Sequence, residues 1–376
     1  MSVYLDFNAS TPIDPRVLGE MVAVYKDCFG NADSRTHLFG QRAKKVVEGA
    51  RTKIASLLQV EKNEIIFTSG ATESDNIAIL GLARWGEENG RKHIVSTKIE
   101  HKAVLEPLKH LAKNGFEITL VDVDKSGRVK ACDVLNQVRP DTLLVSIMHA
   151  NNEMGIIQPV EKIGEELVKT DTYFHIDAAQ TFGKLVNELH NTKYDMLSIS
   201  GHKIYGPQGI GALVLKKRNY RRLPVMPITF GGGQEYGIRP GTLPVALIAG
   251  LGKASEIAGM EYNKWYEKNI TVKNSIVEQL SKVNHVINGD QDYCMAHTLN
   301  VSFIGVDSEA LMLSVKNSCA ISNGSACTSN DYKPSHVLIA MGLSSDIIES
   351  AVRLSWGPHI DHVDISNIVE TIKRMT

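Results

Sequence analysis

Short apolar runs alternate with amphipathic stretches through the first two hundred residues of the chain. Runs typical of buried strands cover 64–68, 93–96, 117–121, 142–148 and the segment that ends at Asp177. Between them, the spacing of apolar residues predicts helices over about 40–58, 76–85, 131–138 and 160–168, with another that opens near 100–103. This alternation predicts an α/β fold with a mainly parallel sheet, whose ligand site lies beyond the strand ends.

The pattern changes after the glycine-rich stretch 230–237. A long helical stretch runs from about 245 to 280, and the residues from about 284 onward have the pattern of a smaller α+β unit. Near the start of the chain, Pro12 and Pro15 mark a turn-rich segment. We therefore predict an N-terminal arm of residues 1–15 that joins the small domain, a large domain of residues 16–255 and a small C-terminal domain of residues 256–376.

The composition excludes some classes of function. Lys and Arg number 41 and Asp and Glu 42, so we expect no direct contact with nucleic acid. No apolar run is long enough to span a membrane, and the first residues lack the pattern of a secretory signal. The five cysteines are odd in number and include no C-x-x-C pair, which favours reduced thiols in the cytoplasm over disulfides or a metal site.

One lysine stands in a segment that is unusual for a surface lysine. Lys203 lies in Ser200-Gly201-His202-Lys203-Ile204-Tyr205-Gly206-Pro207, and the apolar run before this segment ends in Asp177, with Gln180 three residues later. A lysine that forms a Schiff base and an acid that keeps a pyridine nitrogen protonated are parts of a pyridoxal phosphate (PLP) site. The alternatives are an ordinary solvated lysine and an acid in a strand-end turn.

Two further segments fit the same cofactor. Ser69-Gly70-Ala71-Thr72-Glu73-Ser74 joins a predicted strand to a helix, and the N–H groups and dipole at such a helix start bind phosphate. Thr72 can equally be a helix cap, because capping and phosphate binding use the same geometry. His101 opens the next helix, where it has either a structural role or stacks on a cofactor ring and moves protons.

Cys327 differs from the other cysteines because small and polar residues surround it in Gly324-Ser325-Ala326-Cys327-Thr328-Ser329. An exposed thiol on such a loop is a liability unless the protein uses it, and a loop can bring one sulfur first to an active site and then to a partner. Arg353 carries a guanidinium that suits a substrate carboxylate. A salt bridge between domains is the alternative for Arg353.

Together these residues resemble the class V PLP-dependent cysteine desulfurases of the NifS/IscS type. The likeness runs from Tyr4-Leu5-Asp6 nearly to the end of the chain. Besides the turn at Gly70, the lysine segment and the Cys327 loop, the family's motifs are present in order as Glu100-His101, Asn151-Asn152-Glu153-Met154-Gly155, His175-Ile176-Asp177-Ala178-Ala179-Gln180 and Arg239 with Gly241-Thr242-Leu243-Pro244. A single motif would be weak, but the ordered set is specific.

The resemblance implies the PLP-dependent transferase fold type I, with a large PLP-binding domain, a small α+β domain and a homodimer. It implies that Lys203 forms the Schiff base, that Asp177 binds the pyridine nitrogen and that His101 stacks above the ring as an acid and base. Gln180 is expected to contact the ring's phenolic oxygen, and Arg353 and Asn152 to bind the substrate carboxylate. Asn152 is also expected to bind the cofactor. The residues expected to bind the phosphate are Ala71, Thr72, Ser200, His202 and, from the other subunit of the dimer, Thr242.

The implied reaction converts L-cysteine to L-alanine. The sulfur is left on Cys327 as a persulfide and then passes to an acceptor protein. The alternatives within the fold are a selenocysteine lyase and a class V transaminase, and the latter needs no thiol such as Cys327. A catalytically silent scaffold has no physical reason to keep Lys203, Asp177, His101 and Cys327, and a nicotinamide dehydrogenase lacks its G-x-G-x-x-G motif here.

Departures from the usual family pattern bear on the sulfur acceptor. Asn323 stands where a Ser is usual, Pro240 where a Ser is common and Gln234 where a His is common. The chain ends at Thr376, without the longer tail with which the housekeeping iron–sulfur enzyme docks its scaffold protein. The shorter end and the Ser-Asn-Gly-Ser-Ala-Cys loop resemble the DndA-type desulfurases, which implies sulfur supply to DNA phosphorothioate modification. A housekeeping desulfurase for iron–sulfur clusters or tRNA thiolation is the alternative.

Overall fold

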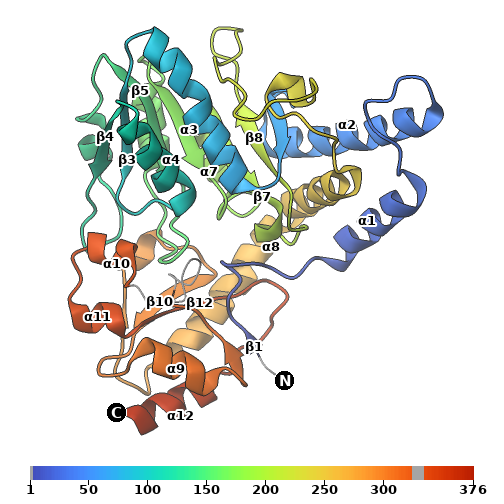
Figure 1. Cartoon of the computed structure of the whole chain (residues 1–376). Coiled ribbons are helices and arrows are strands. Elements are labelled where there is room, and N and C mark those ends of the chain that lie inside the picture. Colours follow the sequence, from blue (N-terminus) through green and yellow to red (C-terminus); the bar gives the residue numbers. More distant parts are fainter. Residues whose placement is uncertain (1–2, 324–333) are drawn as a thin grey trace.

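The computed structural model describes residues 3–323 and 334–376 (Figure 1). Its larger sheet is built from β2 (Ile65–Thr68), β3 (His93–Thr97), β4 (Glu117–Val121), β5 (Thr142–Met148), β6 (Tyr173–Asp177), β7 (Met196–Ser200) and β8 (Gly211–Leu215). The strand order is β2-β8-β7-β6-β5-β3-β4. All neighbouring strands are parallel except β8, which is antiparallel to both β2 and β7. The predicted α/β fold with a mainly parallel sheet is confirmed.

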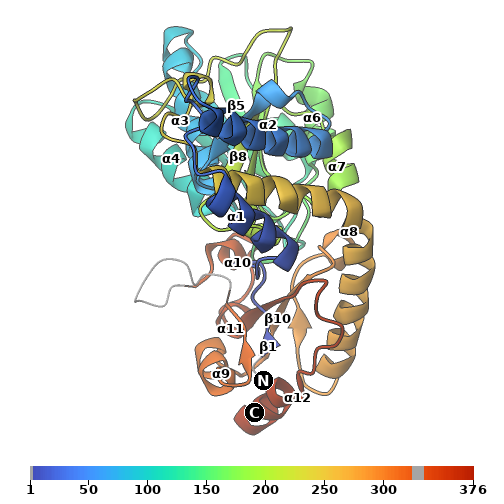
Figure 2. The same ribbon diagram turned by 90° about the vertical axis from the view of Figure 1, so that its right-hand side faces the viewer.

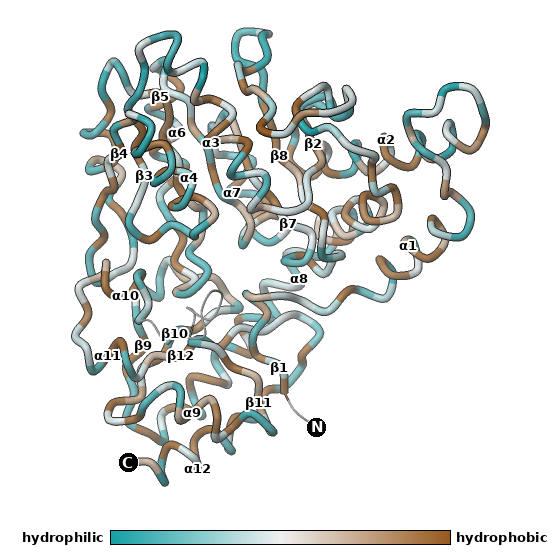
Figure 3. Tube along the Cα trace, viewed as in Figure 1, coloured by the Kyte–Doolittle hydropathy of each residue, from teal (hydrophilic) through white to brown (hydrophobic). Residues whose placement is uncertain are grey.

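Both faces of this sheet are apolar because its strands are covered on both sides. On β2, Ile66 packs with α3 (Ala71–Glu88) in one core, whereas Phe67 packs in a second core with α2 (Leu38–Leu58) and α8 (Val245–Leu280). Figure 3 shows the hydrophobic positions concentrated along the strands and on the inner helix faces. Two-sided burial accounts for the continuous apolar runs in the sequence, which do not alternate as in a half-exposed strand.

In the upper part of Figure 1, the remaining helices connect or cover these strands, except the first, which packs against α8. They are α1 (Pro15–Asp27), α4 (Lys102–Lys113), α5 (Ala131–Leu135), α6 (Val160–Leu167) and α7 (Val186–Asn191), with single 3-10 turns at Lys62–Glu64, Gly201–Lys203 and Glu235–Gly237. The helix predicted from residue 76 begins at Ala71 instead, because Gly70 is its N-cap and the polar first turn carries no apolar periodicity. Helix α1 is not among the predicted helices.

A second group of elements lies beyond α8, which runs from the large sheet down one side of the molecule (Figure 2). Its antiparallel sheet has the order β12-β10-β9, from β9 (Val286–Ile287), β10 (Thr298–Ser302) and β12 (Ala351–Ser355). Around it lie α9 (Ser308–Val315), α10 (His336–Ala340), α11 (Ser345–Glu349), α12 (Ser366–Met375) and a 3-10 turn at Gln291–Tyr293. The predicted domain boundary at residue 255 falls inside α8, and the domain limits stay a prediction.

The start of the chain lies between the two groups. β1 (Val3–Tyr4) pairs in parallel with β11 (Cys319–Ala320). The chain then passes the small sheet, where the Phe7 N–H donates to the Ser355 carbonyl, and reaches the lysine segment, where the Thr11 N–H donates to the His202 carbonyl. This path brings residues 5–11 against both sheets. Within the described ranges, no helix is both long and apolar enough to cross a bilayer.

Candidate active site

A cavity of about 450 Å³ lies at the carboxyl ends of the parallel strands, between the two groups of elements. It gathers most of the residues singled out from the sequence, namely Ala71, Thr72, His101, Asn152, Asp177, Gln180, Ser200, His202, Lys203 and Arg353. Thr242 is exposed and does not line this cavity. Cys327 and the rest of its loop, 324–333, lie outside the described residues. Parallel strands bring these side chains together because their carboxyl ends meet at one edge of the sheet.

Lys203 follows β7 directly, at the end of a 3-10 turn. Its Nζ donates hydrogen bonds to the backbone carbonyls of Asn8 and, at 2.9 Å, of Ala9. Both carbonyls belong to the N-terminal arm, which sequence analysis assigned no part in the site. Two carbonyl acceptors stabilise a charged amine, so the arm holds this lysine at the cavity wall.

Asp177 ends β6 and is almost fully buried. Its carboxylate accepts a hydrogen bond from the Ala179 N–H at 2.9 Å. Burial raises the pKa of Asp177, while the hydrogen bond from the Ala179 N–H and the nearby His101 and Lys203 lower it. Burial lowers the pKa of His101, which is the N-cap of α4 and accepts a hydrogen bond through Nδ1 from the Ala103 N–H at 3.1 Å. A buried acid of this kind suits a cationic partner inside the cavity.

Gln180 and the pair Ser200–His202 form another part of the wall. The Nε2 of Gln180 donates to the Asn8 carbonyl at 3.0 Å, but its buried Oε1 has no hydrogen-bond partner among the described residues. The Ser200 hydroxyl lies 2.9 Å from His202 Nδ1. Burial and then the charge of Lys203 lower the pKa of His202 to about 4, so this ring is neutral near pH 7.

The turn before α3 leaves room for an anion. Gly70 is the N-cap of α3 and makes no side-chain cap, so the first N–H groups of the helix have neither a helical nor a side-chain acceptor there. The φ of Gly70 is +155°, a conformation that L side chains rarely adopt, and Gly70 lines the cavity together with Ala71, Thr72 and Ser200. The cavity wall therefore includes a helix N-terminus with open N–H groups, the kind of site that binds phosphate.

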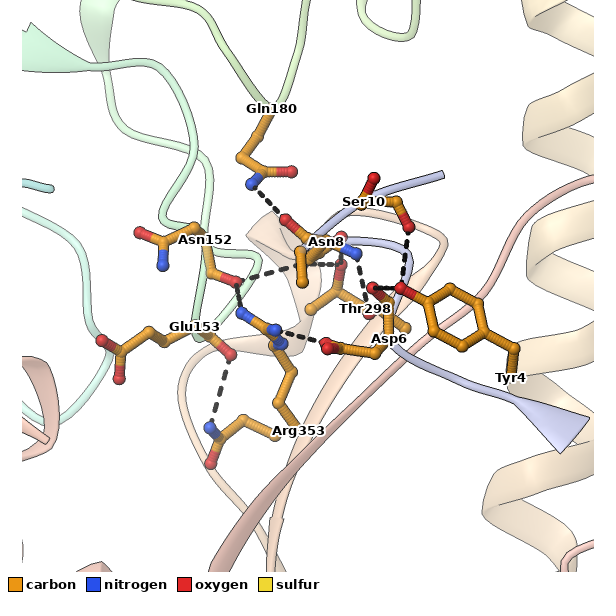
Figure 4. A network of polar contacts seen from close by, with 12 residues as sticks. Tyr4, Asp6, Asn8, Ser10, Asn152, Glu153, Gln180, Thr298 and Arg353 are labelled. Atoms are coloured by element: carbon orange, nitrogen blue, oxygen red, sulfur yellow. Dashed lines mark hydrogen bonds and ion pairs between the residues drawn. The ribbon is translucent and has the colours of Figure 1, made fainter. Parts of the chain in front are cut away.

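Arg353 enters the cavity wall from β12 of the small sheet. Its Nη1 donates to the Asn152 carbonyl at 2.8 Å, and its Nη2 lies 2.5 Å from Asp6 Oδ1 (Figure 4). Its buried Nε has no partner among the described residues. Asn8 belongs to the same hydrogen-bond network, because its side-chain amide donates to the Asn152 carbonyl at 3.1 Å and to Thr298 Oγ1 at 3.0 Å.

Sequence reasoning missed this contribution of the N-terminal arm. Asp6, Asn8 and Ala9 contact Arg353, Gln180 and Lys203, yet the sequence predicts them only as part of the N-terminal arm, with Asp6 in the motif that opens the family likeness. One signal was present: polar Asp6 and Asn8 alternate with Leu5 and Phe7, and both apolar side chains are buried. That alternation indicates a strand-like segment with one face in a core and the other toward a polar site.

The comparison with known families decides what this cavity is. A family model described as aminotransferase class-V matches residues 3–368. The chain belongs to the class-V aminotransferase family. Cysteine desulfurase IscS of Vibrio vulnificus (strain YJ016) is 42% identical to this class-V chain over 376 residues, which cover 99% of the chain and 92% of the relative.

Solved structures of the family agree with this class-V fold. DndA from Streptomyces lividans is 47% identical, with a TM-score of 0.83 over 93% of this chain and 98% of that one. SspA in complex with cysteine is 37% identical, with a TM-score of 0.82 over 95% of this chain and 99% of that one. The resemblance to class V cysteine desulfurases and the fold type I are confirmed, and neither a nicotinamide dehydrogenase nor a transaminase assignment fits these relatives.

The enzymes of this family use PLP, and the predicted cofactor is confirmed at that level. The cavity also fits the group. It offers a helix N-terminus with open N–H groups after Gly70 for a phosphate, a buried carboxylate in Asp177, an unpaired amide oxygen in Gln180 and an amine in Lys203. Among the described residues, no group of three or more His, Cys, Asp or Glu side chains is placed to hold a metal ion.

Proposed function

We propose that this cysteine desulfurase binds PLP through Lys203 and Asp177 and transfers the sulfur of L-cysteine to Cys327. The single observation that supports the assignment is the convergence of Lys203, Asp177, Gln180, His101 and Arg353 on one cavity. The cofactor, when bound, acts as an electron sink for the bond changes at the substrate's Cα and Cβ. The roles of the individual residues follow from their places in the cavity wall.

The large-sheet residues hold the cofactor. Asp177 would place its carboxylate against the pyridine nitrogen and the first turn of α3 would receive the phosphate, together with Ser200 and His202. Gln180 would turn its amide toward the ring's phenolic oxygen. Because burial lowers the pKa of His101, its imidazole is neutral near pH 7 and can accept a proton beside Lys203.

The small-sheet residue Arg353 and the neighbouring Asn152 would hold the substrate carboxylate. The Cys327 thiolate then attacks the substrate sulfur. The bond from that sulfur to Cβ breaks, a bond between the two sulfurs forms, and the carbon takes up a proton to leave as L-alanine. The reaction L-cysteine plus thiol gives L-alanine plus persulfide, which balances without an added oxidant or reductant.

Incubation of the purified, PLP-loaded protein with L-cysteine and a thiol reductant tests this assignment. We expect alanine and sulfide in equal amounts. Lys203→Ala and Cys327→Ala should each lose almost all activity, because covalent catalysis by either group has no substitute. Cys132→Ala is the matched control, since Cys132 is an exposed cysteine far along the chain from these residues. Full activity in Cys327→Ala would show that the persulfide role is assigned wrongly.

The remaining assignments concern assembly and compartment. We propose a cytoplasmic homodimer in which Thr242 of one subunit contacts the phosphate bound by the other. The exposure of Thr242 and its absence from its own subunit's cavity support this arrangement. Sedimentation of the protein at several concentrations tests the dimer, and a lower PLP affinity in Thr242→Ala with an unchanged dimer would support the contact.

For the acceptor, we propose a protein of a DNA phosphorothioate modification system. The 47% identity to DndA from Streptomyces lividans favours this pathway over a housekeeping one, for which the relative named IscS is 42% identical. Expression in cells that lack a DndA-type desulfurase should restore iodine-sensitive phosphorothioate DNA. If it restores only iron–sulfur enzymes in cells that lack the housekeeping desulfurase, the chain belongs to the alternative pathway.

A further inference from the structure

Two groups of the protein itself hold the guanidinium of Arg353. Nη1 donates to the Asn152 carbonyl at 2.8 Å, and Nη2 contacts Asp6 Oδ1 at 2.5 Å (Figure 4). Arg353 is only 4% exposed, so its charge is largely removed from water. A buried arginine without a bound anion is costly, and Asp6 is the carboxylate in direct contact with it among the described residues.

Contacts with the rest of the folded chain hold Asp6 in place. Residue 6 forms a parallel bridge with Ser355, two residues beyond Arg353 on the same strand. The Tyr4 hydroxyl lies 3.1 Å from the Asp6 carbonyl oxygen and 3.0 Å from the Ser10 carbonyl oxygen. These contacts restrain the backbone of the N-terminal arm on both sides of Asp6. The carboxylate and the guanidinium therefore lie on neighbouring backbone segments that are bridged to each other.

This geometry fixes the orientation of the remaining donors. A guanidinium has five N–H donors in one plane, and the two contacts with Asp6 and Asn152 define that plane. The second N–H groups of Nη1 and Nη2 are left for a ligand, whereas Nε is buried without a partner among the described residues. A carboxylate bound bidentately needs two of these donors in a set direction.

We propose that Asp6 is a positioning residue that orients Arg353 and thereby makes the site selective for amines that carry an α-carboxylate. This inference rests on the proposed role of Arg353 in the desulfurase reaction. Asp6 acts through Arg353 and touches neither the cofactor nor the reacting atoms. Its removal should weaken the binding of carboxylate ligands and leave the binding of carboxylate-free amines unchanged.

The test compares two pairs of ligands that differ only in the carboxylate, L-alanine with ethylamine and L-cysteine with cysteamine. Binding of L-alanine and ethylamine to the PLP-loaded protein is followed through the cofactor's absorption spectrum. In Asp6→Ala we expect the Kd of L-alanine to rise about 10-fold or more and that of ethylamine to stay within about 2-fold. With L-cysteine, KM should rise by a similar factor while kcat changes little.

Two further variants separate positioning from a general loss of structure. Asp6→Asn keeps an acceptor of the same shape and should lose less discrimination than Asp6→Ala. In an Arg353→Met background, Asp6→Ala should cause no further loss, because the group that it orients is gone. Asp361→Ala removes an exposed partner of Lys268 and should change neither ligand. The PLP affinity of the cofactor-free protein should be equal in the wild type and in both Asp6 variants.

The outcomes separate the two proposals. If the wild type does not prefer L-alanine to ethylamine, the role of Arg353 in the proposed function fails, and this inference fails with it. If the wild type discriminates but Asp6→Ala weakens both ligands equally, or neither, the positioning role of Asp6 is wrong and the proposed function stands.

Discussion

The Nη2 atom of Arg51 lies 2.6 Å from a carboxylate oxygen of Glu235, and both side chains are almost completely buried. The second carboxylate oxygen of Glu235 lies 3.0 Å from Nη1 of Arg51 and 2.6 Å from the Phe67 N–H at the start of the large sheet. The pair thus anchors the segment around Glu235, which precedes Thr242, to α2 and β2.

Breaking this pair should destabilise the fold strongly. Glu235→Ala leaves the buried Arg51 charge with only the partly exposed Glu48, 3.2 Å from its Nε, as an ion-pair partner among the described residues, and it leaves the Phe67 N–H without an acceptor. We expect a loss of about 3–5 kcal/mol in the free energy of unfolding, measured by urea denaturation of the cofactor-free protein. Arg84→Ala, which breaks an exposed pair with Glu88, should cost less than about 1 kcal/mol. Equal effects in the two variants would contradict the anchoring role.

Glu100 should make stability depend on pH. Its carboxyl group is fully buried between Thr97 Oγ1, at 2.6 Å, and the Met148 N–H, at 2.9 Å, and burial raises its pKa to about 8. The unfolded chain releases this proton near pH 4.5, the ordinary pKa of a glutamate side chain, whereas the folded chain keeps it to about pH 8. The contribution of Glu100 to stability is therefore complete below about pH 4.5 and is lost as the pH rises through this interval.

The measurement for Glu100 is the unfolding free energy from pH 5 to pH 8, compared between the wild type and Glu100→Gln. Glutamine keeps the shape of the neutral acid and has no proton to lose in this interval. The wild type should lose more stability than Glu100→Gln as the pH rises. Parallel curves for the two proteins would show that Glu100 is ionised in the folded chain throughout.

The backbone around Gly211 is packed too closely to accommodate a methyl group. A Cβ at this residue would lie 2.4 Å from the Ile199 carbonyl oxygen and 2.6 Å from the Gly70 Cα. Both neighbours are backbone, so β8 or the turn at Gly70 must move, and we expect Gly211→Ala to cost about 1–3 kcal/mol and to weaken PLP binding. Gly49→Ala, in an exposed helix interior with nothing within 4 Å, should instead stabilise by about 0.5–1 kcal/mol. Unchanged stability and PLP affinity in Gly211→Ala would contradict this account.

Most of the large-sheet part of the site could be predicted from the sequence because its signals are local. Asp177 and Lys203 each follow an apolar run, and parallel strands place such positions at one edge. The contacts of Asp6 and Asn8 could not be predicted in this way. The alternation at residues 5–8 predicts a segment with one polar face, but the Asp6–Arg353 pair spans 347 residues, and no local pattern identifies the partner of that face.

The start of α3 shows a second limit of sequence reasoning. Apolar periodicity places this helix from residue 76, but its first turn contains Thr72 and Glu73, which have no apolar face to reveal it. Glu73 instead contacts the Arg239 side chain at 2.9 Å, and Gly70 supplies the N-cap. The residues that bind a ligand at a helix start are selected for the ligand, so they weaken the pattern that marks the helix.

Asp75 and Asp177 are neighbouring buried acids that both line the cavity. Asp75 is completely buried, and His175 Nε2 lies 3.5 Å from its Oδ1. Burial, and after it the charge of Asp177, raises the pKa of Asp75 well above its ordinary value, which favours its neutral form. Burial raises the pKa of Asp177 too, but the hydrogen bond from the Ala179 N–H and the nearby His101 and Lys203 lower it, and these act on Asp177 alone.

We expect only Asp177 of these two neighbouring acids to be charged, and amide substitution tests this expectation. Asparagine replaces a neutral acid without a change of charge, so Asp75→Asn should keep the Kd for PLP within about 3-fold of the wild type. Asp177→Asn removes the anion expected at the pyridine nitrogen and should weaken PLP binding by at least about 10-fold, or 1.4 kcal/mol. Fluorescence titration of the cofactor-free proteins measures both values. A similar loss in the two variants would mean that Asp75 carries a charge that the site uses.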